Sequence, residues 1–290
     1  MATGVDLGLA RYQRDVVRGM GELALAGLVP GPLRPVLSGG APVVPGEWIE
    51  RRVPALPGTL LDAYAGAVGA PRDGTVPPHL FPQWAFAMSG ELMRGLRYPL
   101  LRAVNGGCRL EVRGALPRGR ELIVRGRLAA VDDDGARAVI TQRFTTGVEG
   151  ATQLLAAEVR VFVPLARRRP RGEKKAPPRA AEGARELGRF DVGPRAGLEF
   201  ALLTGDFNPI HWVRPWARAS GFRGVILHGF GTYARAWEIV RGARGGLGEL
   251  DARFTRPLVL PAAARVLGHQ DRVWVVDDRD AVVMEGRVLR

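Results

Sequence analysis

The chain has 290 residues, of which 46% are hydrophobic and 24% are charged, which is ordinary globular composition for one or two domains. Its net charge of +13 favours anionic partners but does not choose among them. The single cysteine, Cys108, excludes an intrachain disulfide and a multi-cysteine metal site.

Residues 1–48 are predicted to form an N-terminal helical extension. Their first part is apolar but is interrupted by charged residues such as Asp6, Arg11 and Glu22. The chain has no run of about 18 uncharged apolar residues, so we predict no membrane span, and we recognise no signal peptide. Docking on the protein's own surface is the simpler role for this extension, and lying on a membrane is the alternative. With one cysteine, these features fit a cytoplasmic protein.

The next part, residues 49–166, is predicted to contain helices followed by strands. Small residues over Leu60–Gly69 indicate one helix, and Trp84–Met93 has helical spacing after a proline-rich loop. Asp132–Gly135 predicts a hairpin turn. The predicted strands are Cys108–Arg113, Glu121–Leu128, Ala136–Thr146 and Leu154–Val163.

Residues 167–184 are predicted to be a linker. Its segment Arg167–Arg179 is basic, rich in proline and without large apolar residues, so it has nothing to pack. A nucleic-acid-binding patch is the alternative, but this segment has no aromatic residues on which bases would stack. We therefore predict no nucleic-acid partner.

The last part, residues 185–290, repeats the plan of the first. A helix over Leu198–Leu203 is predicted to stop at Gly205, a C-cap, and a second helix runs from near Gly229 to about Arg241. The predicted strands are Leu250–Phe254, Ala264–His269, Arg272–Val276 and Ala281–Leu289. The repeated order of a helix, a loop, a longer helix and an antiparallel meander indicates a duplicated unit.

An ungapped match of the two halves shows what they do not share. Aligning Gly69 with Gly205 puts Ala70 opposite Asp206 and Thr75 opposite His211. If the halves are duplicates, only the second kept the aspartate and the histidine.

Asp206 and His211 are the strongest candidates for chemistry. A separation of five puts them on different sides of a regular helix, and about 16 Å apart in an extended strand. Asn208–Pro209 supplies the turn that brings them together, and the Asn208 amide can tie the loop to nearby backbone. A carboxylate and an imidazole that converge on one water form a general acid–base pair. A hydrogen bond that only closes the loop is the alternative.

His228 and Gly229 form the second candidate feature. They follow the apolar Val225–Leu227 and precede a helix, so Gly229 would lie where free backbone amides and the helix dipole favour negative charge. Such a position can bind the oxygen of a polarised thioester carbonyl. An ordinary glycine at a strand-to-helix turn is the alternative, and His228 is expected to be structural. The sequence shows no zinc spacing and no dinucleotide or phosphate-loop motif, so we predict no metal and no cofactor.

Taken together, these residues resemble the signature of MaoC-like (R)-specific enoyl-CoA hydratases. The resemblance lies in Leu203–His211, Ala219–Phe222 and Val225–Gly229, and more loosely in Phe254–Leu260. It implies an α+β double hotdog, in which two antiparallel sheets, each wrapped around a central helix, join into one continuous sheet. The first half would be the degenerate hotdog and residues 185–290 the catalytic one.

The resemblance also implies an activity: reversible hydration of trans-2-enoyl thioesters to (R)-3-hydroxyacyl thioesters. Asp206 and His211 would hold and ionise the water, Asn208 would position the pair, and the Gly229 amide would bind the thioester oxygen. The thioester would come on coenzyme A or an acyl carrier protein, and a homodimer is compatible with the fold. The implied substrate-binding residues are Phe207, Pro209, Ile210 and His228.

One departure from the family pattern concerns the residues after the histidine. Family members often have an acidic residue there, whereas this chain has His211-Trp-Val-Arg-Pro-Trp216. We expect Trp212 and Trp216 to be core residues rather than the lining of an acyl tunnel.

Three other functions remain as alternatives. A hotdog acyl-thioesterase would share the fold but not the Asp206–His211 loop, and a non-catalytic acyl-binding subunit would have no need of all four catalytic candidates. A nucleic-acid binder would account for the charge alone. We further hypothesise that the loop from Gly69 to Pro82, which lacks the pair, opens a groove for long or bulky acyl chains.

Overall fold

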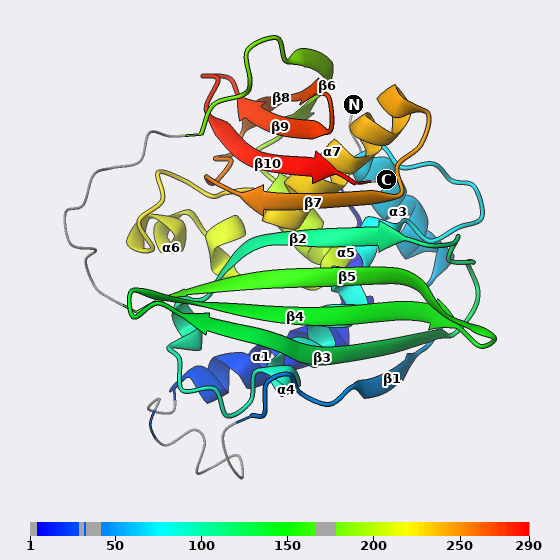
Figure 1. Cartoon of the computed structure of the whole chain (residues 1–290), viewed down its shortest axis with the longest axis vertical. Helices are drawn as coiled ribbons and strands as arrows, with labels where there is room; N and C mark the ends of the chain where they lie inside the picture. The colour runs from blue at the N-terminus through cyan, green and yellow to red at the C-terminus, as the bar shows by residue number, and fades with distance from the viewer. Residues whose placement is uncertain (1–4, 29–31, 33–41, 166–177, 290) are drawn as a thin grey trace.

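The computed structural model describes residues 5–28, 32, 42–165 and 178–289. Within them, one sheet of 10 strands runs through the whole molecule in the order β1-β3-β4-β5-β2-β7-β10-β9-β8-β6 (Figure 1). All its pairings are antiparallel. The prediction of a single continuous antiparallel sheet is therefore confirmed, although the linker predicted over 167–184 lies largely outside the described residues.

The strands fall into two sets of five that are separated by the linker segment. The first set is β1 (Ile49–Val53), β2 (Val104–Val112), β3 (Leu122–Asp133), β4 (Arg137–Val148) and β5 (Ala151–Pro164). The second set is β6 (Arg185–Val192), β7 (Glu249–Phe254), β8 (Ala262–His269), β9 (Arg272–Asp277) and β10 (Val282–Val288). Counted from either edge of the sheet, the strands follow the same order within their set: first, third, fourth, fifth and second. The second strands of the two sets, β2 and β7, meet in the middle, so the halves are related by a pseudo-twofold arrangement.

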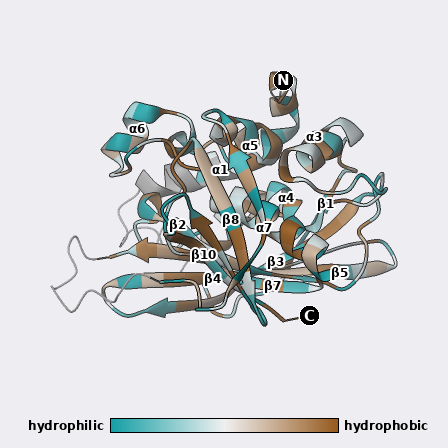
Figure 2. Ribbon diagram, turned by 90° about the horizontal axis from the view of Figure 1, so that it is seen from above, coloured by the Kyte–Doolittle hydropathy of each residue, from teal (hydrophilic) through white to brown (hydrophobic). Residues whose placement is uncertain are grey.

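The helices lie on one face of this sheet (Figure 2). The α-helices are α1 (Arg14–Leu28), α3 (Gly58–Val68), α4 (Pro82–Leu92), α5 (Ala196–Thr204), α6 (Arg214–Ala219) and α7 (Gly229–Arg244). The 3-10 helices are η1 (Leu7–Gln13), η3 (Pro78–Leu80), η4 (Leu100–Arg102) and η5 (Pro209–His211). No helix of the described residues is both long enough and apolar enough to cross a membrane.

The two halves share a core. The middle strands pair so that Leu110 of β2 lies opposite Leu250 of β7, and both are fully buried. One hydrophobic cluster includes Trp84 of α4 and Trp237 of α7 together with residues from both sets of strands. Because apolar surface from both halves is removed from water in the same cluster, neither half is expected to be stable when the other is removed.

Local signals fixed most of the elements. Gly205 ends α5 in the left-handed conformation (φ 84°) and its amide donates to Ala201 O at 2.8 Å, as predicted for a C-cap. Gly135 (φ 77°) lies in the predicted hairpin between β3 and β4.

The strands β1 and β6 and the short α-helix α6 were not predicted. β1 and β6 are the two outer strands of the sheet, and most of their side chains are exposed or half-buried. An edge strand of this kind has no regular alternation of buried residues, so periodicity does not reveal it. The prediction that the second helix of each half is the longer one is wrong for the first half, where α3 and α4 each have 11 residues.

Candidate active site

The loop after α5 is built by side chains that bond to their own backbone. Asp206 Oδ1 accepts from Asn208 N at 3.2 Å, and Asn208 Oδ1 accepts from Ile210 N at 3.3 Å. Pro209 then begins η5, a position that suits its fixed φ and missing N–H. The predicted turn and the predicted tie from Asn208 to nearby backbone are both present, and they carry the chain from Asp206 to His211.

His211 is buried at the end of η5. Its Nδ1 lies 2.8 Å from Ile226 O. A carbonyl oxygen only accepts, so Nδ1 carries the proton and Nε2 of the neutral ring keeps its lone pair. This contact leaves Nε2 as the nitrogen that is available to take a proton.

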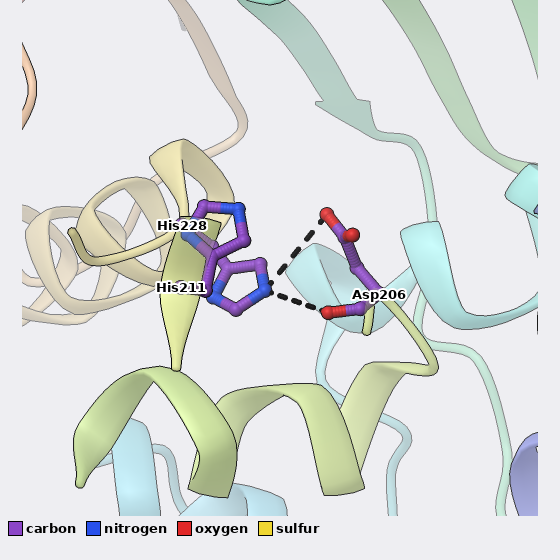
Figure 3. Close-up of side chains that lie close together, drawn as sticks. All are labelled: Asp206, His211 and His228. Carbon is purple, nitrogen blue, oxygen red and sulfur yellow. Dashed lines mark hydrogen bonds and ion pairs between the residues drawn. The ribbon is translucent and has the colours of Figure 1, made fainter. Parts of the chain in front are cut away.

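His228 lies against both members of the pair. Its Nε2 donates to the backbone oxygen of Asp206 at 2.9 Å and lies 3.8 Å from Asp206 Oδ2. Its ring stacks on that of His211, with ring centroids 3.5 Å apart and an interplanar angle of 21°. Figure 3 shows the two imidazoles beside the Asp206 side chain, with dashed lines for the two contacts from His228. His228 therefore fixes the backbone of the aspartate, which agrees with the structural role expected of it.

Burial keeps both imidazoles neutral. Loss of solvation lowers the pKa of His211, and the nearby Asp206 carboxylate opposes this shift. For His228, burial and then the neighbouring His211 lower the pKa to about 3. At neutral pH both imidazole rings of the site are therefore uncharged.

Gly229 is the first residue of α7, directly after His228. The amides of a helix's first turn have no acceptor within the helix, and the helix dipole adds partial positive charge there. A Cβ at this position would lie 2.6 Å from the ring of Phe254, so the position has space only for glycine while that ring stays in place. The predicted placement of Gly229 at a helix N-terminus is present.

The same three side chains are also close enough to be considered as cation ligands. Ligand atoms of Asp206, His211 and His228 all lie within 4.8 Å of one another. One nitrogen of each ring, however, is already committed as a donor to a backbone oxygen. The prediction that the chain uses no metal stays a prediction.

Comparisons with known proteins show what the second half of the chain and its fold resemble. Residues 181–287 match the family model described as "MaoC like domain". A peroxisomal hydratase-dehydrogenase-epimerase of Neurospora crassa is 28% identical over 158 residues, which make up 50% of this chain and 17% of that protein. The chain thus spans only a small part of this relative.

Two solved structures from Mycobacterium tuberculosis resemble the whole fold. HtdX has a TM-score of 0.67 at 18% identity, over 83% of this chain and 99% of that one. A second protein, described as having a double hotdog fold, has a TM-score of 0.58 at 15% identity, over 85% and 96% of the two chains. Residues 181–287 form a MaoC-like domain. The predicted α+β double hotdog is confirmed as well.

The remaining predicted residues of the MaoC-like domain lie around the pair. Phe207, Pro209 and Ile210 are half-buried in the same loop, and their contact with substrate stays a prediction. The expectation that two tryptophans are core residues is wrong, because Trp212 is 43% exposed and Trp216 57% exposed. Trp212 Nε1 donates to Phe207 O at 3.1 Å, so this ring braces the outside of the loop.

Two contributors to the site were missed from the sequence. Gly197 in α5 lies so close to the end of η5 that a Cβ on it would be 1.8 Å from His211 O. A glycine inside a helix lowers its stability by up to about 1 kcal/mol relative to alanine, so a helical glycine often indicates that another part of the chain packs closely there. The other contributor is the carbonyl of Ile226, which side-chain patterns do not reveal.

The first half contains a counterpart of this region without the pair. Val76 N donates to Leu116 O at 2.8 Å, just as Leu227 N donates to Leu258 O at 2.8 Å in the MaoC-like domain. The isolated bridges agree, since Thr75 pairs with Pro117 and Ile226 pairs with Val259. Thr75 therefore corresponds to Ile226 rather than to His211, because the ungapped alignment takes no account of the longer second loop.

The Gly69–Pro82 loop does line a cavity. Its volume is about 360 Å³, and Thr75, Val76 and Pro78 face Trp237 and Glu238 of α7 across it. Neither member of the Asp206–His211 pair lines this cavity, nor does Gly229. Whether long acyl chains use it stays a prediction.

Proposed function

We propose that this protein catalyses the reversible hydration of trans-2-enoyl thioesters to (R)-3-hydroxyacyl thioesters. The observation that carries the proposal is the convergence of the Asp206 carboxylate and the His211 ring, which offer ligand atoms within 4.8 Å of each other, with Nε2 of His211 left free by the contact of Nδ1. The helix N-terminus at Gly229, directly after His228, is the third group. Each group has a separate task in adding water across a conjugated double bond.

The pair would activate the water. The neutral His211 ring accepts at Nε2, and the Asp206 carboxylate accepts as well, so a water between them is held by both of its hydrogens. Its oxygen then forms a bond to C3 of the enoyl group as one O–H bond breaks. The low pKa of His211 keeps its lone pair free at neutral pH.

The electrons of the double bond would move toward the thioester carbonyl. The developing enolate oxygen accepts from the Gly229 amide, whose partial charge is set in place before the reaction. The proton released by the water passes through the Asp206–His211 pair to C2, and the thioester bond remains intact. The conjugated thioester is itself the electron sink, so this sequence uses no metal or redox cofactor.

The comparisons support the reaction class. The family model belongs to MaoC-like domains, and the Neurospora relative is named as a hydratase among its other activities. The (R) configuration, the individual residue roles and the carrier, coenzyme A or acyl carrier protein, are parts of the proposal. So is the cytoplasmic location.

The test follows the ultraviolet absorbance of trans-2-enoyl-CoA of four carbons and of long chain, with chiral analysis of the product. We expect absorbance to fall with the wild type and the product to be the (R)-alcohol. Asp206→Asn and His211→Ala should each lower kcat by about 10²- to 10⁴-fold, because each removes an acid–base group.

Asp278→Asn is the matched control, since this exposed carboxylate lies in the turn between β9 and β10, outside both the candidate site and the hypothesised acyl groove. It should keep the wild-type rate, as should the wild type after incubation with a chelator. Release of free thiol without loss of conjugation would instead indicate a thioesterase and contradict the proposal. Turnover of four-carbon and long-chain substrates at equal rates would contradict the acyl-groove hypothesis alone.

A further inference from the structure

The N-terminal helices lie directly on the elements that carry the candidate site. η1 contacts α5, and α1 contacts α4. The docked side chains Leu9, Gln13 and Val16 are 5%, 0% and 2% exposed, so this is a closely packed contact. Docking on the protein's own surface, the simpler of the two roles considered from the sequence, is what the structure shows for residues 7–28.

Gln13 is the polar centre of this contact. Its Nε2 donates to Leu202 O at 2.9 Å. Leu202 is in the last turn of α5, where carbonyl oxygens have no N–H donor within the helix, and the neighbouring Ala201 O is already bonded to Gly205 N. Gln13 thus caps the last turn of α5, which ends at Thr204 just before Gly205 and Asp206 begin the loop, from a position 189 residues away from Leu202 in the chain.

Val16 packs on the turn itself. A Cβ on Gly205 would lie 2.6 Å from Val16 Cβ and 3.2 Å from Gln13 Oε1. Gly205 adopts the left-handed conformation, and the next residue is Asp206. The N-terminal helices therefore contact the backbone immediately before the proposed catalytic carboxylate.

The same helices are held by the first half. Gln83 of α4 donates through Nε2 to Gln13 Oε1 at 3.3 Å and to Tyr12 O at 3.4 Å. Further along, a Cβ on Gly19 would be 2.7 Å from Ala87 O, so α1 and α4 touch at their backbones. The segment connects α4 of one half to the end of α5 of the other.

We propose that residues 7–28 are a positioning element for the Asp206 loop, with Gln13 as its positioning residue. His228 holds the Asp206 backbone oxygen from one side, and Gln13 with Val16 fixes the end of α5 from the other. Removing Gln13 lets the last turn of α5 loosen, so the carboxylate spends less time in register with His211. This inference rests on the proposed hydratase function.

The test compares Gln13→Met, which keeps the volume but removes both hydrogen bonds, with Arg18→Ala in the adjoining helix α1. Arg18 is exposed and pairs with Glu22 on its own helix, so its loss leaves the docked face intact. For Gln13→Met we expect kcat to fall about tenfold with KM changed less than about twofold, because small displacements of catalytic groups act on the chemical step. A general loss of folded protein would lower the active fraction but leave the kcat of active sites unchanged, so rates are normalised to folded protein.

Hydrogen exchange of the backbone amides over residues 203–212 gives a readout independent of activity. We expect about tenfold faster exchange there in Gln13→Met, with the β4–β5 amides unchanged and Arg18→Ala like the wild type. Unchanged kcat or unchanged loop exchange in Gln13→Met, in a wild type that hydrates enoyl thioesters, would overturn the inference. If the wild type does not hydrate them, the proposed function fails, and the exchange result alone decides whether the segment positions the loop.

Discussion

The two halves of this molecule have the same architecture, and around the candidate site they differ in one loop and one dipeptide. Each half has an outer strand, a helix that ends at a left-handed glycine, a second helix and four more strands. Between the glycine and the matched strand segment, the first half has residues 70–74, whereas the second has residues 206–225 with the Asp206–His211 loop and α6. The acid–base pair is thus part of an inserted loop rather than of the shared scaffold.

The dipeptide difference concerns the proposed oxyanion site. The matched hydrogen bonds place Pro77–Pro78 of the first half opposite His228–Gly229 of the second. Proline has no backbone N–H, so the position equivalent to Gly229 has no donor for a thioester oxygen. The first half therefore lacks both the acid–base pair and the amide, even though its helices and strands are retained.

The difference at Gly229 is tested by copying the first half's residue into the second. Gly229→Pro should lower kcat about 10²- to 10³-fold, because it removes one preorganised donor to the developing oxyanion. Gly229→Ala is the control: it retains the N–H but meets the same Phe254 ring. The ratio of the two kcat values measures the effect of losing the amide N–H, and equal values would contradict the proposed role of Gly229.

A second prediction concerns His228, which has no counterpart in the first half. Its folded-state pKa of about 3 lies below the ordinary 6.5, so the unfolded chain binds a proton that the folded chain does not. The stability that neutral His228 contributes to the folded state is fully present above pH 6.5 and is lost as pH falls toward 3. His228→Gln should therefore reduce the slope of unfolding free energy against pH in this window by up to about 1.4 kcal/mol per pH unit.

Urea unfolding of the wild type and the variant between pH 4 and pH 8 measures that slope. His79 and His211 also have pKa values lowered by burial, so some pH dependence should remain in the variant. Superimposable slopes for the two proteins would mean that His228 is not buried as a neutral ring.

The smallest expected effect separates the buried histidines of the two halves. His79 accepts from the Tyr64 hydroxyl at Nδ1 (2.8 Å) and donates to Glu238 Oε1 from Nε2 (2.9 Å), so both ring nitrogens are used structurally. His79→Ala should lower the unfolding free energy by about 2 kcal/mol by leaving buried partners unsatisfied. We expect the kcat of the folded variant to stay within about twofold of the wild type, and a loss like that of His211→Ala would contradict a purely structural role.

The segment with the chemical groups and most of the helices and strands could be predicted from the amino-acid sequence alone. Glycine at 205 and the Asn208–Pro209 turn are local signals, because backbone conformation there depends on residues a few positions apart. The same is true of the helix start at Gly229. The two edge strands escaped prediction because their solvent-facing residues have no periodic pattern.

Which distant groups complete the site depends on tertiary packing and could not be predicted. The Ile226 carbonyl sets the tautomer of His211, and Gln13 caps α5 across 189 positions. Tertiary packing also moved Trp212 and Trp216 from the expected core to the surface. Such contacts depend on how helices pack against one another, and a backbone carbonyl has the same chemistry in every residue, so no local pattern encodes them.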